Sequence, residues 1–453
     1  MTATSSDPTL TDRMAAFATD TTFEDLADDV VDEAKRGLLD TIGVILVGAA
    51  DPATGIVRSV IAADPTGVGS TVAGSAVTAS MPLAALVNGY AAHVMDYDDT
   101  QHRVGTHMSA PVVGAALPMA ESLHRSGRDL IAAYAIGFEV GCRLGRANSF
   151  ARHLSKRRIH ATGYLGHFGA TVAGGRLTGL DGVQMRRSFG IAAGYASGTM
   201  RSFGTMGKAQ NAANAAQNGV YSAMLAELGF TAPEDIFDGD GSIFTMCGGQ
   251  TDAGQLLDGL GKEYEVTTNT RKEFACAGWR NPIVDASMRL VNDHGLKVDD
   301  IESVHVWAAP NVSHLPNYPV PTSGLESKFS AQYAAAVALC DLAGGAHQFS
   351  DERVADPAVI DLCRRTALSF DQDFGPFQIR IELKTHDGKD LSQFIPVQKG
   401  DYKNPLSWDD LMVKFKANAA TVLAADSVDE LGELIRNLET VDDVATLARL
   451  LRT

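Results

Sequence analysis

The sequence lacks the features that mark several classes of protein. Its five cysteines include no C-x-x-C pair, which argues against a disulfide framework and a zinc site. The longest apolar runs, such as 42–50, are shorter than the roughly 18 residues of a membrane span. The first residues show no basic start followed by an apolar core, so no signal peptide is predicted. We therefore expect a cytoplasmic protein that does not bind membranes.

An excess of positive charge is also missing. The chain has 55 acidic and 38 basic residues, for a formal net charge of −17, which opposes binding to nucleic acid or anionic lipid. The glycine cluster at 67–74 lacks the G-x-G-x-x-G spacing and no P-loop lysine follows it, so nucleotide binding is not expected. An anionic substrate would have to be held by a few local lysine, arginine or histidine side chains.

At 453 residues the chain is long enough for two hydrophobic cores. From about 22 to 229 the apolar residues recur at helical spacing, with many alanines and glycines between them. Thr22 and Asp25 resemble a capping start. The clearest helical stretches lie at 83–95, 130–144, 183–196 and 208–228. Small residues at this density favour a compact all-helical domain.

The pattern changes after about residue 263. Strand-like alternation appears at 301–308, 377–383 and 391–397, the last two separated by an Asp-Gly turn. Helical runs at 283–294 and 329–342 lie among them, and 408–423 and 442–451 return to helix. We predict a mainly α protein with an α+β part. A large all-helical domain (1–265, completed by 400–453) carries a smaller α/β lid domain (266–399) inserted before the C-terminal helices.

Several segments resemble those of the MmgE/PrpD family. They are NGYAAHVMDYDDT at 88–100 with TH at 106–107, HATG at 160–163, FGTMGK at 203–208, Lys272 with PIVDA at 282–286, and ESKFSAQY at 326–333. They occur in the expected order along most of the chain. The family includes 2-methylcitrate dehydratases, cis-aconitate decarboxylases and an iminodisuccinate epimerase. The resemblance implies a helical domain with an α/β lid, a homodimer, and no metal or organic cofactor.

The loop from Asp96 to His107 concentrates groups suited to proton transfer beside a carboxylate, which needs a base near the carbon and cations for the developing charge. His107 is the first candidate acid/base residue, because imidazole titrates near neutral pH and the family has a functional histidine here. The alternative is a loop histidine that caps a helix near Ser109. Asp96 would orient His107 or contact substrate, or else bridge a helix end. Thr100 would donate to a substrate carboxylate or act as a cap.

The other two aspartates of this loop, Asp98 and Asp99, are interpreted as solvated charges or helix caps, and no metal site is expected. His160 precedes a helix rich in alanine and glycine, where the dipole favours a bound anion. It is either a second acid/base group or a packed core histidine. Lys208 opens another helix and would grip a substrate carboxylate, as the family implies, or form a surface salt bridge.

Three positions on the lid side are further substrate-binding candidates. Lys272 resembles Lys208 in role, although its charged neighbours also fit an ordinary surface. Arg280 could hold a carboxylate in a bidentate grip, with a surface arginine as the alternative. His314 stands where the family's decarboxylases have an active-site tyrosine. Relatives commonly carry histidine at the positions of Asn211 and Asn281, and asparagine cannot shuttle a proton.

The function predicted from these residues is a cofactor-independent lyase. It would be a dehydratase or decarboxylase of a small di- or tricarboxylate, such as a methylcitrate- or aconitate-like acid. Two alternatives remain open. One is an epimerase of a dicarboxylate such as iminodisuccinate, and the other is a non-catalytic relative that binds polycarboxylates.

Overall fold

A computed structural model describes residues 7–62, 69–250 and 252–453 of the chain. The first six residues, on which the signal-peptide prediction partly depends, lie outside the described residues. So do Gly67 and Val68, with which the glycine cluster begins.

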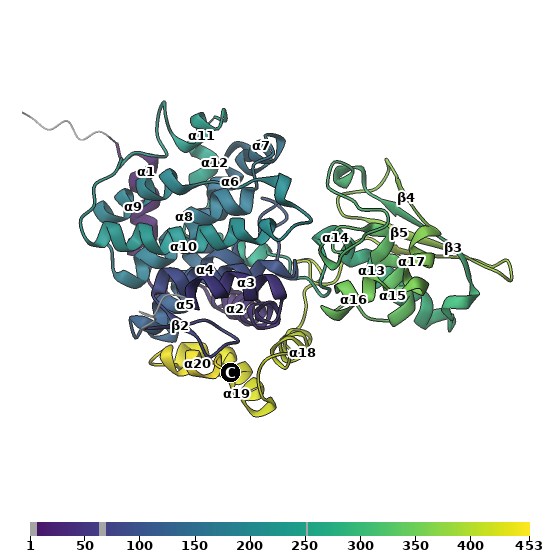
Figure 1. The fold of residues 1–453 in the computed structure, drawn as a ribbon. Helices are drawn as coiled ribbons and strands as arrows, with labels where there is room; N and C mark the ends of the chain where they lie inside the picture. Colours follow the sequence, from purple (N-terminus) through teal and green to yellow (C-terminus); the bar gives the residue numbers. More distant parts are fainter. Residues whose placement is uncertain (1–6, 63–68, 251) are drawn as a thin grey trace, which may run out of the picture.

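Helices make up the larger part of the molecule (Figure 1). In chain order this helical body contains α1 (Leu10–Asp20), α2 (Asp28–Ala49), α3 (Pro52–Ala62), α4 (Met81–Val94), α5 (Ser109–Ser122), α6 (Gly127–Arg146), α7 (Phe150–Lys156), α8 (Ala161–Thr178), α9 (Gly182–Tyr195), α10 (Gly207–Glu227), α11 (Ile243–Met246) and α12 (Ala253–Leu257). A two-stranded ribbon, β1 (Ser70–Thr71) and β2 (Thr78–Ala79), precedes α4. The C-terminal helices α18 (Trp408–Ala419), α19 (Ala425–Arg436) and α20 (Ala445–Leu450) pack against this body.

The smaller part is a four-stranded sheet with helices. Its strands are β3 (Ile301–Ala308), β4 (Thr366–Phe370), β5 (Ile379–Thr385) and β6 (Asp390–Ile395), in the order β4-β3-β5-β6. β3 and β4 are parallel, while β3–β5 and β5–β6 are antiparallel. α13 (Asn281–His294) packs on β5 and β6, and α15 (Ala331–Asp341) packs on β3 and β4. Three short helices, α14 (Gly324–Ser327), α16 (Asp351–Val354) and α17 (Pro357–Arg364), complete it.

Local sequence signals set several of these boundaries. Capping boxes start α6 at Ser126 and α9 at Asp181, and Gly179 ends α8 in the left-handed conformation. The Thr22–Asp25 box belongs to a single 3₁₀ turn, Phe23–Asp25. The long helix α2 begins only at Asp28, so the predicted start of that helix was a few residues early.

Two hydrophobic cores meet at the C-terminal end of α4. The first lies within the helical body and includes residues from all of its helices except α3, and from α18 to α20. The second fills the space between the sheet and its helices, and also takes in Val94, Met95 and Tyr97. The chain just after α4 is therefore held between the two parts, and it carries the candidate site residues Asp96, Thr100 and His107.

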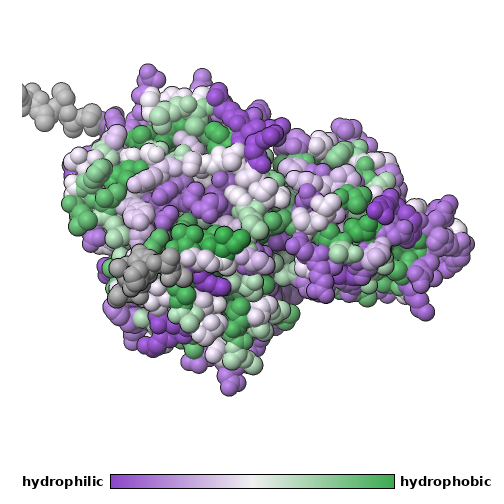
Figure 2. All heavy atoms as spheres, in the orientation of Figure 1, coloured by the Kyte–Doolittle hydropathy of each residue, from purple (hydrophilic) through white to green (hydrophobic). Residues whose placement is uncertain are grey.

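The predicted fold class is confirmed: the protein is mainly α, and its α+β part precedes the C-terminal helices. Within the described residues, no single helix is long and apolar enough to cross a membrane. Only α2 and α3 taken together pass that test, by length and composition, and they meet at an angle of 86°. On the face shown in Figure 2, a band of apolar residues crosses the helical body near α3, which carries the exposed Ile56 and Val60.

Small residues allow the helices of the body to approach closely, and Gly48 gives a direct test. A Cβ atom at this position in α2 would overlap the backbone carbonyl of Ala91 in α4. We expect Gly48→Ala to destabilise the protein by about 1–3 kcal/mol, because backbone cannot move aside as a flexible side chain can. Gly55 in α3 has nothing within 4 Å of such an atom. Gly55→Ala should therefore be neutral or slightly stabilising.

Thermal unfolding of the two variants measures this difference. Equal melting temperatures for Gly48→Ala and Gly55→Ala would contradict the close packing of α2 on α4.

Candidate active site

A buried carboxylate with two ammonium partners lies at the centre of the site. Asp96 follows α4 in the left-handed conformation, with φ of 52°, and is 2% exposed. Its two oxygens bond the Nζ atoms of Lys208 and Lys272, each at 2.6 Å. Burial alone would raise the pKa of the Asp96 carboxyl, but the two ammonium groups hold it well below its usual range. Asp96 is therefore ionised at neutral pH, and it joins the loop after α4 to α10 and to the segment before α13.

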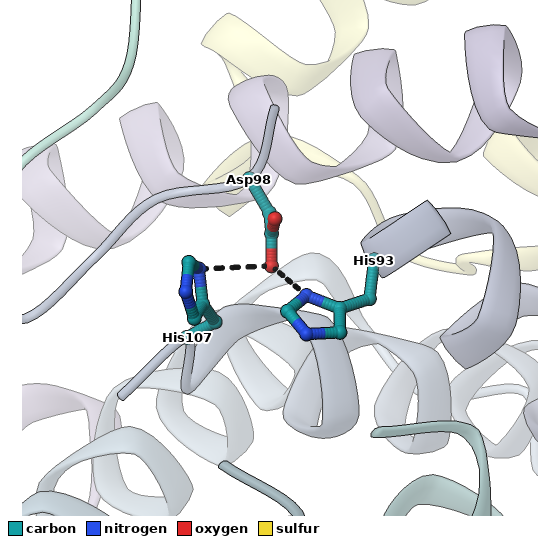
Figure 3. Close-up of side chains that lie close together, drawn as sticks. All are labelled: His93, Asp98 and His107. Carbon is teal, nitrogen blue, oxygen red and sulfur yellow. Dashed lines mark hydrogen bonds and ion pairs between the residues drawn. The ribbon is translucent and has the colours of Figure 1, made fainter. Parts of the chain in front are cut away.

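A second buried carboxylate, Asp98, bonds two imidazoles (Figure 3). One of its oxygens lies 2.7 Å from Nδ1 of His93 and 3.4 Å from Nδ1 of His107. Burial would raise the pKa of Asp98, but the imidazoles hold it well below its usual range. Burial lowers the pKa of His107 to about 4. Burial lowers the pKa of His93 as well, so both rings are neutral at neutral pH. His93 donates Nδ1–H to Asp98, and the ionised Asp98 oxygen 3.4 Å from Nδ1 of His107 favours the proton on that nitrogen, which leaves Nε2 of His107 unprotonated.

His160 differs from His93 and His107 in which ring nitrogen carries the proton. It is the N-cap residue of α8, 5% exposed, and its ring stacks on that of His93 with centroids 5.7 Å apart. Asn211 donates Nδ2–H to Nδ1 of His160 at 3.1 Å, and its amide is oriented by the backbone N–H and carbonyl of Thr199. Burial holds the pKa of His160 well below its ordinary value. The one ring proton of His160 must therefore be on Nε2.

Backbone contacts fix the loop that carries these groups. Thr100 and Thr270 exchange two backbone hydrogen bonds of 2.7 and 3.1 Å. From α18, the Lys414 ammonium bonds Asp40 at 2.7 Å and the backbone carbonyls of Tyr97 at 3.1 Å and Lys272 at 2.7 Å. Lys414 thus donates two hydrogen bonds and forms one ion pair, and the C-terminal helix holds both active-site segments in place.

A small cavity adjoins the cluster. Its volume is about 10 Å³, and its walls include His93, Asp96, Lys208, Lys328 and the loop Gly204–Met206. Thr205 and Met206 are exposed, so this loop separates the cavity from solvent. Phe203 packs edge-on against His160, and its ring centroid lies 5.8 Å from Nζ of Lys208.

The structure brings most of the predicted site residues together. Asp96, His107, His160 and Lys208 converge around Asp98 and His93. The Thr100 hydroxyl lies 3.5 Å from Nδ1 of His107. Lys272 is fully buried rather than part of a charged surface, and it bonds both the carboxylate and the backbone carbonyl of Asp96.

Two predicted residues lie elsewhere. Arg280 is buried, not on the surface, and donates to the carbonyls of Pro316 and Phe329 while stacking on Trp279. It braces the backbone of the smaller part and does not line the cavity. His314 is exposed in a turn after β3 and is not joined to the cluster. Tyr318, four residues later, reaches the site loop instead, with its hydroxyl 3.3 Å from the Phe203 carbonyl.

The interpretation of Asp98 and Asp99 as solvated charges was wrong, since both are fully buried. Asp99 bonds Ser109 and Asn269, and burial raises its pKa to about 6. Sequence reasoning also missed His93. Its position in the last turn of α4, directly before the loop of candidate residues, was the available signal.

His93, Asp98 and His107 place their ligand atoms within 4.8 Å of one another, a spacing that could hold a metal ion. The geometry favours a hydrogen-bonded group, because both imidazoles point Nδ1 at a single carboxylate oxygen. The Lys272 ammonium, 4.0 Å from the other oxygen of Asp98, would also repel a cation. That the site needs no metal stays a prediction.

The buried neutral histidines predict an acid-sensitive fold. An unfolded histidine has a pKa near 6.5, whereas that of His107 in the folded protein is about 4. Between these values the unfolded chain binds a proton that the folded chain does not, so stability falls as pH decreases from about 6.5 to 4. We expect a shallower fall in melting temperature over this range for His107→Gln than for the wild type. Parallel curves for the two proteins would show that His107 is not held neutral.

Comparison with known proteins identifies the family of this chain. Residues 12–255 match the MmgE/PrpD N-terminal domain, and residues 274–440 match the MmgE/PrpD C-terminal domain. The chain is 30% identical to a cis-aconitate decarboxylase of Homo sapiens over 450 residues, covering 94% of this chain and 91% of the relative. It is 27% identical to a cis-aconitate decarboxylase of Aspergillus terreus, covering 98% and 96%. The chain belongs to the MmgE/PrpD family.

Proposed function

We propose that the chain is a lyase that removes CO2 from an aconitate-like tricarboxylate. The curated relatives that match nearly its whole length are named cis-aconitate decarboxylases, which supports this reaction class. The observation that carries the proposal is the His93–Asp98–His107 group beside the Lys208 ammonium. It combines a proton carrier with a fixed positive charge in one buried place.

His107 is the proton carrier in this proposal. Its Nδ1–H is held by the ionised Asp98, and its free Nε2 can take up a proton. A polyanionic substrate raises the pKa of a nearby imidazole, because it stabilises the imidazolium form. Substrate binding therefore charges His107, with Asp98 supporting the cation from behind. The acid needed for the reaction exists only when substrate is bound.

His160 and Lys208 stabilise the charge that develops on the substrate. The N-terminus of α8 favours an anion, and Asn211 keeps the His160 proton on Nε2, where it can be donated to a carboxylate oxygen. Lys208 offers an ammonium group whose recorded hydrogen bond, among the described residues, is to Asp96. Both groups act where electrons accumulate, which lowers the barrier more than uniform binding would.

The proton and electron balance of the step is simple. The bond between carbon and the departing carboxylate breaks, and CO2 leaves. The electron pair shifts through the adjacent double bond to a carbon beside a remaining carboxylate. Nε2–H of His107 protonates that carbon, and the neutral imidazole later recovers a proton from solvent. One substrate and one proton give one CO2 and one unsaturated dicarboxylate.

Turnover of cis-aconitate by the purified protein tests this function. We expect one CO2 per substrate consumed, and one deuterium in the product when the reaction runs in deuterated water. His107→Ala should lose at least about 100-fold in kcat, the usual range for an acid/base group. His124→Ala, at an exposed histidine paired with Asp443, is the control and should match the wild type.

The dehydratase alternative is tested by comparing 2-methylcitrate with cis-aconitate as substrates. A dehydratase would form an alkene from 2-methylcitrate without releasing CO2 from cis-aconitate. That result would overturn the proposal in favour of the dehydratase alternative.

The role of Asp98 gives a second test. An asparagine at 98 has nearly the same shape but no charge to support the His107 imidazolium, so we expect Asp98→Asn to lower kcat at least about 100-fold. Asp99→Asn is a matched control, since Asp99 is equally buried but bonds Ser109 and Asn269 instead of the imidazoles. Similar kcat values for the two variants would contradict the role given to Asp98.

A further inference from the structure

Lys328 is a buried lysine that lacks the carboxylate partner of the other buried lysines. Four lysines of the described residues are buried: Lys208, Lys272, Lys328 and Lys414. Three of them have a carboxylate oxygen 2.6–2.7 Å from Nζ. Lys328 is 3% exposed, yet the structure records no ion pair for it within the described ranges. Its ammonium bonds the Val94 carbonyl at 3.2 Å and lies 3.8 Å from the Met95 sulfur, a weak acceptor.

The position of Lys328 explains what could supply the missing charge. It follows α14 in the smaller part of the molecule and lines the small cavity together with Lys208 of α10. His93 lines the same cavity, and its Nε2 is buried without a hydrogen-bond partner among the described residues. Buried polar groups are normally satisfied, so the underpaired ammonium of Lys328 indicates a ligand in this cavity. Because Nδ1–H of His93 donates to Asp98, its Nε2 is an acceptor and would take a donor such as water, not a carboxylate oxygen.

The charges around the cavity indicate the sign of that ligand. Two carboxylates, Asp96 and Asp98, face three ammonium groups, those of Lys208, Lys272 and Lys328, while the imidazoles are neutral. Asp51 and Asp351 act on Lys328 from beyond ion-pair distance, so among the described residues its ammonium has no carboxylate in contact. Burial lowers the pKa of the Lys328 ammonium, which an anion beside it would reverse.

We propose that Lys328 is a substrate-binding residue that holds one carboxylate of the substrate across the cavity from Lys208. This inference rests on the proposed function and names a binding residue for it. A carboxylate in this place would join the helical body, through Lys208, to the smaller part, through Lys328. A tricarboxylate needs far more than 10 Å³, so the exposed wall at Thr205 and Met206 must move outward on binding.

Binding of a non-reactive tricarboxylate tests the proposal without requiring turnover. Propane-1,2,3-tricarboxylate is titrated calorimetrically into the wild type, Lys328→Met, Lys328→Gln and Lys328→Arg. We expect Kd to rise at least about tenfold in the methionine and glutamine variants and to recover partly in the arginine variant, which restores the charge. Lys384→Met, at a half-exposed lysine on β5 paired with Glu302, should bind like the wild type.

Kinetics with cis-aconitate add a second reading. Lys328→Met should raise KM at least about tenfold and change kcat less, since the residue binds substrate without carrying its proton. Circular dichroism identifies a variant that fails to fold, and the glutamine variant then serves in place of the methionine one.

The outcomes separate the two proposals. Unchanged Kd in folded Lys328→Met or Lys328→Gln overturns the inference, even if the wild type decarboxylates cis-aconitate. Weakened binding in those variants, together with a wild type that releases no CO2, supports the subsite and overturns the proposed function. A wild type that binds no tricarboxylate overturns the inference.

Discussion

A carboxylate removed from water must be compensated within a few ångströms, and Asp96 meets this requirement with two lysines from distant parts of the chain. Removing either partner would leave buried charge unpaired, at a cost of about 3–5 kcal/mol. The interaction also holds Asp96 in a left-handed conformation that only a few residue types adopt readily. The loop after α4 is therefore fixed by electrostatics as much as by packing, and the remaining site residues take their positions from it.

The imidazoles next to this ion cluster are buried, which favours their neutral forms. Their different partners then determine which nitrogen carries the proton. The ionised Asp98, 3.4 Å from Nδ1 of His107, favours the proton on that nitrogen, whereas Asn211 donates to Nδ1 of His160. As a result, Nε2 of His107 is an acceptor and Nε2 of His160 is a donor within the same cluster. Asn211, which departs from the family pattern, thus has a positive role in setting a tautomer.

Periodicity and turn signals in the sequence predicted the fold well, because helix and strand repeats reflect local burial. The predicted bounds of β3 match the structure, whereas β4 was not identified, because its five residues, TALSF, are mostly partly exposed and do not alternate between buried and exposed. The candidate site was likewise predicted only in part. The family motifs indicated Asp96, His107, His160 and Lys208, but a single sequence does not reveal burial, and so Asp98 was interpreted as a solvated charge or a helix cap. Likewise, nothing local to Lys328 or Arg280 indicates that one lines a cavity and the other braces backbone.

The central claim is that this buried cluster binds a polycarboxylate and transfers a proton to it. A crystal structure of the wild type with propane-1,2,3-tricarboxylate bound tests that claim most directly. The account predicts one carboxylate between Lys208 and Lys328, another accepting from Nε2 of His160, and the carbon chain beside Nε2 of His107. A ligand bound away from these side chains, with the cluster unchanged around Asp96, would contradict it.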